Sequence, residues 1–259
     1  MRHAVGRKQA IRGLVSLSVQ GTRDVQEDFV LSSPERNIFV VADGFGGSSA
    51  GVDASRTACE SVRAFLEKEI GDEDATLPFV IRKYYSLAAN VLFNAVLHAN
   101  RRVLVLNQAK NVQERGGASL LAGFLDGNHV ALANVGSCVS YLWRAGRVTR
   151  LTTPRSYGQL VDPVEEHVEV SETRWRVPLS ALGMTEDLEP EIYEFQGRPG
   201  DILAVGTSGR EMTDILTVAG MARSSGERPL REALGSGLRA AQERYEKFRS
   251  NTSISLILL

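Results

Sequence analysis

The chain has 259 residues, 24% of them charged, and a formal net charge of -1, which is enough for one large domain or two small ones. The near-neutral charge argues against a general nucleic-acid binder, which normally carries a basic surplus. No apolar run has the length of a membrane span, and none follows the basic N-terminus as in a secretory signal. Two cysteines, Cys59 and Cys138, form neither a disulfide framework nor a zinc cluster. We therefore expect a cytoplasmic protein with no nucleic-acid or membrane partner.

Alternating or continuous β-branched character predicts nine strands along the chain. They cover 13–19, 37–43, 117–126, 129–135, 138–143, 147–152, 190–196, 201–207 and 253–259. Asp126-Gly127-Asn128 and Arg144-Ala145-Gly146 separate neighbouring runs and predict hairpin turns. Four strands in succession between 117 and 152 thus predict an antiparallel meander.

Apolar residues at helical spacing predict helices around 54–66, at about 77–108 and at 228–248, the last being weakened by two glycines. Strands grouped in the middle with helices on both sides indicate α+β layering. We expect one domain over 1–259, a four-layer α-β-β-α sandwich of two antiparallel sheets flanked by helix pairs. The proline-containing stretch at about 153–180 is expected to form an irregular flap.

Two segments carry the candidate chemistry. In Val40–Gly47 an apolar run ends on Asp43, and three glycines follow within four positions, so that backbone groups could approach a ligand closely. The alternative is an ordinary Asp-Gly turn. In Arg23–Asp28 an arginine precedes three carboxylates. On an extended strand Arg23 and Glu27 would face the same side and hold a phosphate oxygen beside a divalent metal. The alternative is a solvated charge run.

Taken together, these segments resemble the first two signature motifs of the metal-dependent type 2C (PPM-type) serine/threonine phosphatases. The resemblance continues over residues 21–259 through six further segments. They are Gly116-Gly117-Ala118-Ser119, Ala133–Cys138, Leu151-Thr152, Ala181-Leu182-Gly183, Gly200–Leu203 with Thr207-Ser208-Gly209, and Ser250-Asn251-Thr252. The resemblance implies a β-sandwich flanked by helix pairs, and hydrolysis of phosphoserine or phosphothreonine by a water that bridges two Mg²⁺ or Mn²⁺ ions.

By position, the resemblance also assigns roles to individual residues. Asp43 would be the carboxylate that bridges both metals, and the Gly44 carbonyl would bind the second metal. Glu27 would hold that metal through water, and Asp28 belongs to the same metal-binding set. Arg23 would clamp the substrate phosphate.

The sequence departs from the family pattern at three ligand positions. The family has aspartate at each, and this chain has Ser137, Ser208 and Ser250 instead. The last two, with Asp43, would hold the first metal. A serine hydroxyl is short and neutral, so it lacks the reach and charge that a hard dication needs. We expect Mn²⁺ or Mg²⁺ at reduced occupancy, or none. Glu211 could replace Ser208 across a tight turn, although its position also suits the start of a helix.

Three functions stay open on this evidence. The first is a pseudophosphatase that binds a protein partner, phosphorylated or not, without turning it over. The second is an enzyme that retains one metal at Asp43, Gly44 and Glu27. The third is a scaffolding domain whose cleft has no role. By analogy with the architecture we expect a monomer.

Overall fold

The computed structural model describes residues 10–46, 48–71, 81–157, 160, 177–209, 212–222, 226–244 and 250–259. Its named strands form two five-stranded antiparallel sheets. The first sheet has the spatial order β1 (Gly13–Val19), β10 (Thr252–Leu258), β9 (Ile202–Gly206), β6 (Val139–Arg144) and β7 (Arg147–Arg150). The second has the order β2 (Asp28–Ser33), β3 (Ile38–Phe45), β4 (Gly117–Asp126), β5 (His129–Val135) and β8 (Glu191–Gln196).

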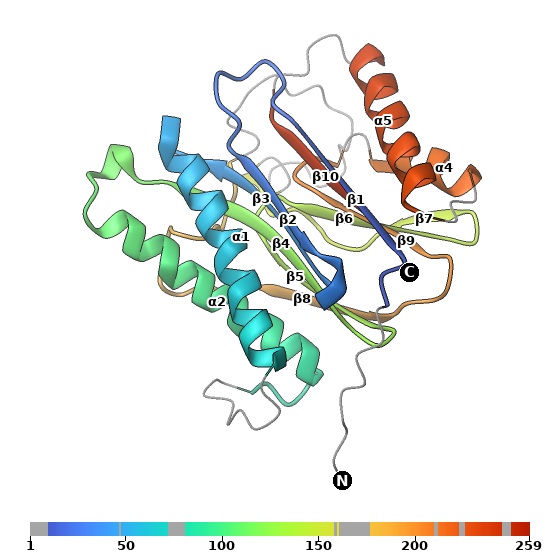
Figure 1. The fold of residues 1–259 in the computed structure, drawn as a ribbon. Coiled ribbons are helices and arrows are strands. Elements are labelled where there is room, and N and C mark those ends of the chain that lie inside the picture. Colours follow the sequence, from blue (N-terminus) through green and yellow to red (C-terminus); the bar gives the residue numbers. More distant parts are fainter. Residues whose placement is uncertain are drawn as a thin grey trace.

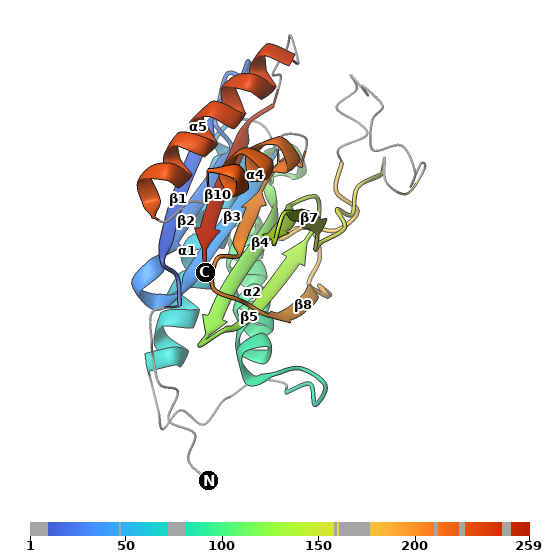
Figure 2. The same cartoon turned by 90° about the vertical axis from the view of Figure 1, so that its right-hand side faces the viewer.

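Helices cover the outer face of each sheet (Figures 1 and 2). The second sheet is covered by α1 (Ser48–Gly71) and α2 (Leu87–Gln108), and the first by α4 (Met212–Met221) and α5 (Glu227–Arg244). Short 3-10 turns, η1 (Pro34–Arg36) and η2 (Val112–Glu114), precede β3 and β4. The predicted α+β sandwich of two antiparallel sheets between helix pairs is confirmed.

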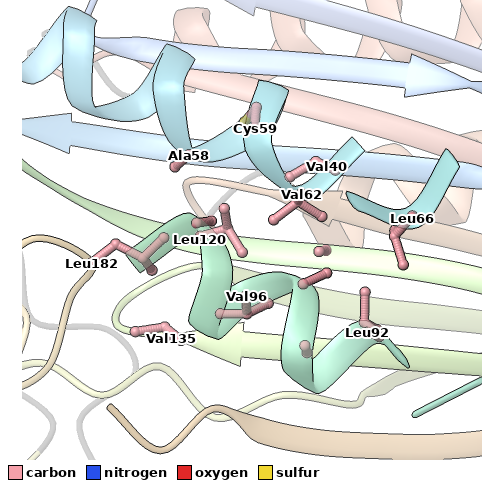
Figure 3. Packing of buried hydrophobic residues seen from close by; sticks show 14 of the residues in the cluster. Val40, Ala58, Cys59, Val62, Leu66, Leu92, Val96, Leu120, Val135 and Leu182 are labelled. Atoms are coloured by element: carbon pink, nitrogen blue, oxygen red, sulfur yellow. The ribbon is translucent and has the colours of Figure 1, made fainter. Parts of the chain in front are cut away.

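Alternation along the strands explains the three apolar cores. Val40 and Ala42 of β3 pack under α1 and α2, whereas Phe39 and Val41 point into the space between the two sheets. Because both faces of this central strand are buried, its sequence is continuously apolar rather than alternating. Figure 3 shows the outer core, where α1 and α2 project apolar side chains onto the second sheet. Packing on both faces thus positions the end of β3, where Asp43 lies.

The helix boundaries shift at several ends. The first helix begins at Ser48, earlier than the apolar spacing indicates. The second begins at Leu87, where the Ser86 hydroxyl accepts a hydrogen bond from the Ala89 amide at 3.1 Å and caps the helix. Residues 77–80 and 245–248, which the sequence predicts as helical, lie outside the described residues, as does most of the predicted flap. The edges of the flap are joined by a β-bridge between Ser156 and Pro178.

The predicted meander between 117 and 152 is wrong. The two hairpins form with the predicted turns, Asp126 opposite His129 and Arg144 opposite Arg147, but they belong to different sheets. The chain crosses from one sheet to the other between β5 and β6. Gly136 provides the turn there with φ +86°, a conformation that favours glycine. β2 and α4 are also elements that the sequence reading did not define.

None of the described helices combines the length and apolarity that a transmembrane helix requires.

Glu194 of β8 ties the second sheet to the loop before α2. Its carboxylate contacts His129 Nε2 at 2.7 Å and accepts a hydrogen bond from the Ser86 amide at 3.4 Å. Burial raises the pKa of Glu194, but hydrogen bonds from Ser86 and His129 outweigh it, so the pKa lies below its ordinary value of 4.5. The charged carboxylate therefore stabilises the fold.

We expect Glu194→Gln to lower the free energy of unfolding at pH 7 by about 1 kcal/mol. Because the folded-state pKa is depressed, the stabilisation is present above the unfolded pKa and is lost as pH falls through the folded one. The difference from wild type should therefore shrink in more acidic buffer, as the Glu194 carboxyl becomes protonated. Urea unfolding between pH 3 and pH 7 measures it. Glu243→Gln, at an exposed position of α5, is the control and should show no such trend.

Candidate functional site

Two carboxylates lie side by side at one end of the second sheet. Asp28, the first residue of β2, is opposite Asp43 of β3 and is only 5% exposed. Burial, followed by the neighbouring Asp43 carboxylate, raises the pKa of Asp28 well above its usual value. Like charges this close do not both ionise readily, so Asp43 adds to the effect of burial in favouring the protonated form of Asp28. The strand register thus places two predicted site residues in direct contact.

The buried Asp28 carboxylate is bound by hydroxyls from the first sheet. The Thr207 hydroxyl donates to Asp28 Oδ2 at 2.7 Å and accepts from the Ser253 amide at 3.0 Å. The Ser253 side chain also hydrogen-bonds to Asp28. The other carboxylate oxygen, Oδ1, is buried and receives no hydrogen bond from the described part of the chain. The site therefore draws residues from both sheets.

Glu27 lies between β2 and the first turn of α1. Its carbonyl accepts hydrogen bonds from the Ser55 hydroxyl at 2.6 Å and the Gly44 amide at 3.2 Å. Its amide donates to Asn251 Oδ1 at 2.9 Å. The Glu27 carboxylate lies against Gly51, where an added Cβ would be only 2.2 Å from Oε1. A negative charge is favoured at this helix end, and α1 has no acidic residue in its own first turn.

The glycines after Asp43 allow two parts of the backbone to pack closely against each other. A Cβ on Gly44 would lie 2.1 Å from the Gly51 carbonyl oxygen and 2.7 Å from that of Glu27. Gly46 adopts φ +126°, and a Cβ there would be 2.6 Å from the Arg115 carbonyl oxygen. The segment is thus more than an ordinary Asp-Gly turn, because it packs backbone against backbone beside the carboxylate pair.

Arg23 is exposed and lies in a turn, since β2 begins only at Asp28. The expectation that Arg23 and Glu27 share one face of an extended strand is therefore wrong. The Arg23 carbonyl accepts a hydrogen bond from Gln20 Nε2 at 2.7 Å, which shapes this turn. Its role as a phosphate clamp stays a prediction.

The three serines that the resemblance assigns to ligand positions lie in segments that border the carboxylate pair. The Ser137 hydroxyl is 3.1 Å from that of Ser119, which is opposite Asp43 in β4. Ser208 is buried and directly follows Thr207. Ser250 directly precedes an asparagine that binds the β1–β2 loop.

That asparagine, Asn251, donates from Nδ2 to the carbonyls of Gln20 at 2.8 Å and Val25 at 3.1 Å. Together with Thr207 and Ser253 it forms the network around Asp28 and Glu27. The sequence reading gave none of these three a role. The one feature of the sequence that could have indicated them is their position next to Ser208 and Ser250.

The donor set does not fit a two-metal centre. Among the described residues no three histidine, cysteine, aspartate or glutamate side chains converge into a metal-binding group. At the positions that the resemblance assigns to the first metal, the chain has one carboxylate, Asp43, and two neutral serine hydroxyls, whereas a hard dication needs charged oxygen ligands. Glu211, the candidate substitute, lies outside the described residues. Asp28 Oδ1, which is buried beside Asp43 and accepts no hydrogen bond from the described residues, is a suitable oxygen ligand for a single cation.

Cys138 is a fully buried free thiol close to the same pair. Burial, followed by the charges of Asp43 and Asp28, raises the pKa of its thiol well above the usual range. The thiolate is the reactive form of cysteine. Cys138 therefore acts as a small buried apolar residue.

Two five-stranded sheets between helix pairs, with a carboxylate pair at one sheet end, define a phosphatase-type sandwich. The family model described as Protein phosphatase 2C matches residues 22–215, more than half of the chain. The chain therefore belongs to the protein phosphatase 2C family. No curated protein matches it at significant similarity.

Several solved bacterial structures share this fold. The PPM Ser-Thr phosphatase MsPP of Mycobacterium smegmatis is 21% identical, with a TM-score of 0.71 over 96% of this chain and 99% of that one. PstP/Ppp of Mycobacterium tuberculosis is 22% identical, with a TM-score of 0.69 over 95% and 97%. PppA of Pseudomonas aeruginosa is 22% identical, with a TM-score of 0.71 over 96% and 98%. At these identities the likeness establishes the fold alone.

Proposed function

We propose that this protein is a pseudophosphatase, a phosphatase-like binding protein of serine/threonine phospho-signalling. Its site recognises a protein partner, phosphorylated or not, and does not turn it over. The proposal extends to a monomeric, cytoplasmic protein without nucleic-acid or membrane partners. PppA, which has the same fold, is described as a key regulatory component of T6SS, so a regulatory role has a precedent on this architecture.

The observation that carries the proposal is the neutral network around Asp28. Its carboxylate is held by the Thr207 hydroxyl at 2.7 Å and lies beside Asp43. The resemblance assigns a charged ligand to the next position, which is Ser208 here. Replacing two aspartates by serines removes two negative charges that would face the first dication. Without them, neither the affinity for a metal pair nor the acidification of a bridging water is supplied.

A second candidate function is an enzyme that works with one metal. The observation in its favour is Asp28 Oδ1, a buried acceptor that no described donor satisfies. Glu27, Asp28, Asp43 and the Gly44 carbonyl are the groups that would hold such an ion. PstP has been solved in complex with 2 Manganese ions, so the ion to test is Mn²⁺. When bound, it would supply Lewis-acid activation of water.

The deciding experiment is hydrolysis of an aryl phosphate by purified protein in millimolar Mn²⁺, with Asp43→Asn measured beside the wild type. The pseudophosphatase proposal predicts equal background rates for both proteins. Turnover by the wild type alone would refute it and support the one-metal enzyme.

Scaffolding without a working cleft is tested separately. Once a partner is found, Arg23→Ala and Asp43→Ala are expected to weaken its binding, as measured by calorimetry. Unchanged binding of both variants would mean that the cleft does not take part in recognition.

A further inference from the structure

Asn134 carries a buried amide that no described group satisfies. The residue is 1% exposed, and neither Nδ2 nor Oδ1 has a hydrogen-bond partner in the described part of the chain. Exchanging the two amide atoms does not help, since both lack a partner. A dry, unsatisfied polar group costs about 1–3 kcal/mol. The position therefore calls for a ligand that both donates and accepts hydrogen bonds.

The register of the second sheet places this amide between the two sheets. In β5, Ala133 packs under α1 and α2, whereas Leu132 belongs to the core between the sheets. Because successive side chains alternate, Asn134 shares the inner face with Leu132. Its neighbours across the ladders are Leu121 on β4 and Glu191 on β8.

Polar groups border this position on both sides. Ser119 is two residues from Leu121 on the same face of β4, which makes it a diagonal neighbour of Asn134 at roughly 7 Å. Its hydroxyl is 3.1 Å from that of Ser137. On the other side, Glu191 accepts a hydrogen bond from the Tyr193 hydroxyl at 3.1 Å. A water molecule can bridge polar groups at this separation, such as Asn134 and Ser119, and it needs two to four polar partners.

We propose that Asn134 binds one or two ordered internal waters that bridge its amide to the Ser119–Ser137 hydroxyl pair. The amide and the two hydroxyls are neutral, and the neighbouring Glu191 carboxylate is paired with Arg155, so the position favours water over a metal ion. Because Ser119 is opposite Asp43, the bound water extends the polar network of the candidate site into the sandwich. It gives the Ser137 hydroxyl a neutral partner at the place where the family pattern has a carboxylate. The site is independent of whether the protein is an enzyme or a binder.

A high-resolution crystal structure of the full chain tests the proposal. The expected result is a solvent peak within hydrogen-bonding distance of both amide atoms of Asn134 and of at least one serine hydroxyl. Direct bonding of the amide to protein groups, without such a peak, would overturn it.

Two variants give an independent measurement by oxygen-17 water relaxation, which counts long-lived internal waters. The near-isosteric Asn134→Leu is expected to lose about one or two of them relative to wild type. Ser119→Ala, which removes one hydroxyl, keeps the amide and should shorten the residence time of the same water. The proposal is contradicted if folded Asn134→Leu has as many long-lived internal waters as wild type. It is also contradicted if the residence time of the water is unchanged in Ser119→Ala.

Discussion

The double variant Ser208→Asp/Ser250→Asp is expected to gain Mn²⁺ binding, with an affinity on the order of 100-fold above wild type, because ligand charge largely sets affinity for hard dications. The two carboxylates would join Asp43 to complete the ligand set that the family resemblance assigns to the first metal. The surrounding backbone is already fixed, since Thr207 binds Asp28 and Asn251 binds the β1–β2 loop. Calorimetric titration with Mn²⁺ measures the change.

A second readout separates metal binding from simple addition of charge. Ser208 is 9% exposed, so an unpaired aspartate there should lower the melting temperature without metal. Mn²⁺ should then restore it by mass action. Hydrolysis of an aryl phosphate should also become dependent on Mn²⁺.

The matched control is Ser208→Asn/Ser250→Asn, which has nearly the same shape and no added charge. It should bind Mn²⁺ no better than wild type. If the folded aspartate variant behaves like this control, the two serines do not lie at the ligand positions that the resemblance assigns to them.

The strands could be predicted because their pattern is local. A strand with one buried face alternates apolar and polar residues, and a strand buried on both faces is apolar throughout. The structure has strands with the predicted bounds at 13–19, 117–126 and 129–135. β2 could not be predicted in this way, because it begins with Asp28 at the end of a charged segment and ends with two serines. The partner of each strand is also absent from the local pattern. β6 pairs with β9 from far along the chain, which is why the predicted meander failed.

The site was predictable as a set of positions but not as a network. The resemblance placed Asp28, Asp43 and Gly44 together, and the register of β2 and β3 brings them side by side. The hydroxyl that holds Asp28 comes from Thr207, 179 residues away, and no sequence spacing reveals such a contact. The glycine-rich segment was expected to admit a ligand. Its closest contacts are instead with backbone, because α1 starts directly against it.

That close packing leads to the largest expected change in stability, in Gly44→Ala. The new Cβ would lie 2.1 Å from the Gly51 carbonyl oxygen and 2.7 Å from that of Glu27. Both obstacles are backbone, so no side chain can rotate away, and β3 and α1 must move apart. We expect the free energy of unfolding to fall by about 3 kcal/mol, the upper end of the usual range for overpacking. Urea unfolding with an unchanged m-value measures it.

The comparison that decides this prediction is Gly226→Ala, where an added Cβ meets no atom within 4 Å. Gly226 stands just before α5, and its substitution should change stability by less than about 0.5 kcal/mol. Equal stability of the two variants would mean that the end of β3 and the start of α1 can move apart at little cost. In that case Asp43 would not be held firmly beside Asp28. A large loss in Gly44→Ala alone would instead show that the end of β3 is packed tightly against α1, next to the carboxylate pair.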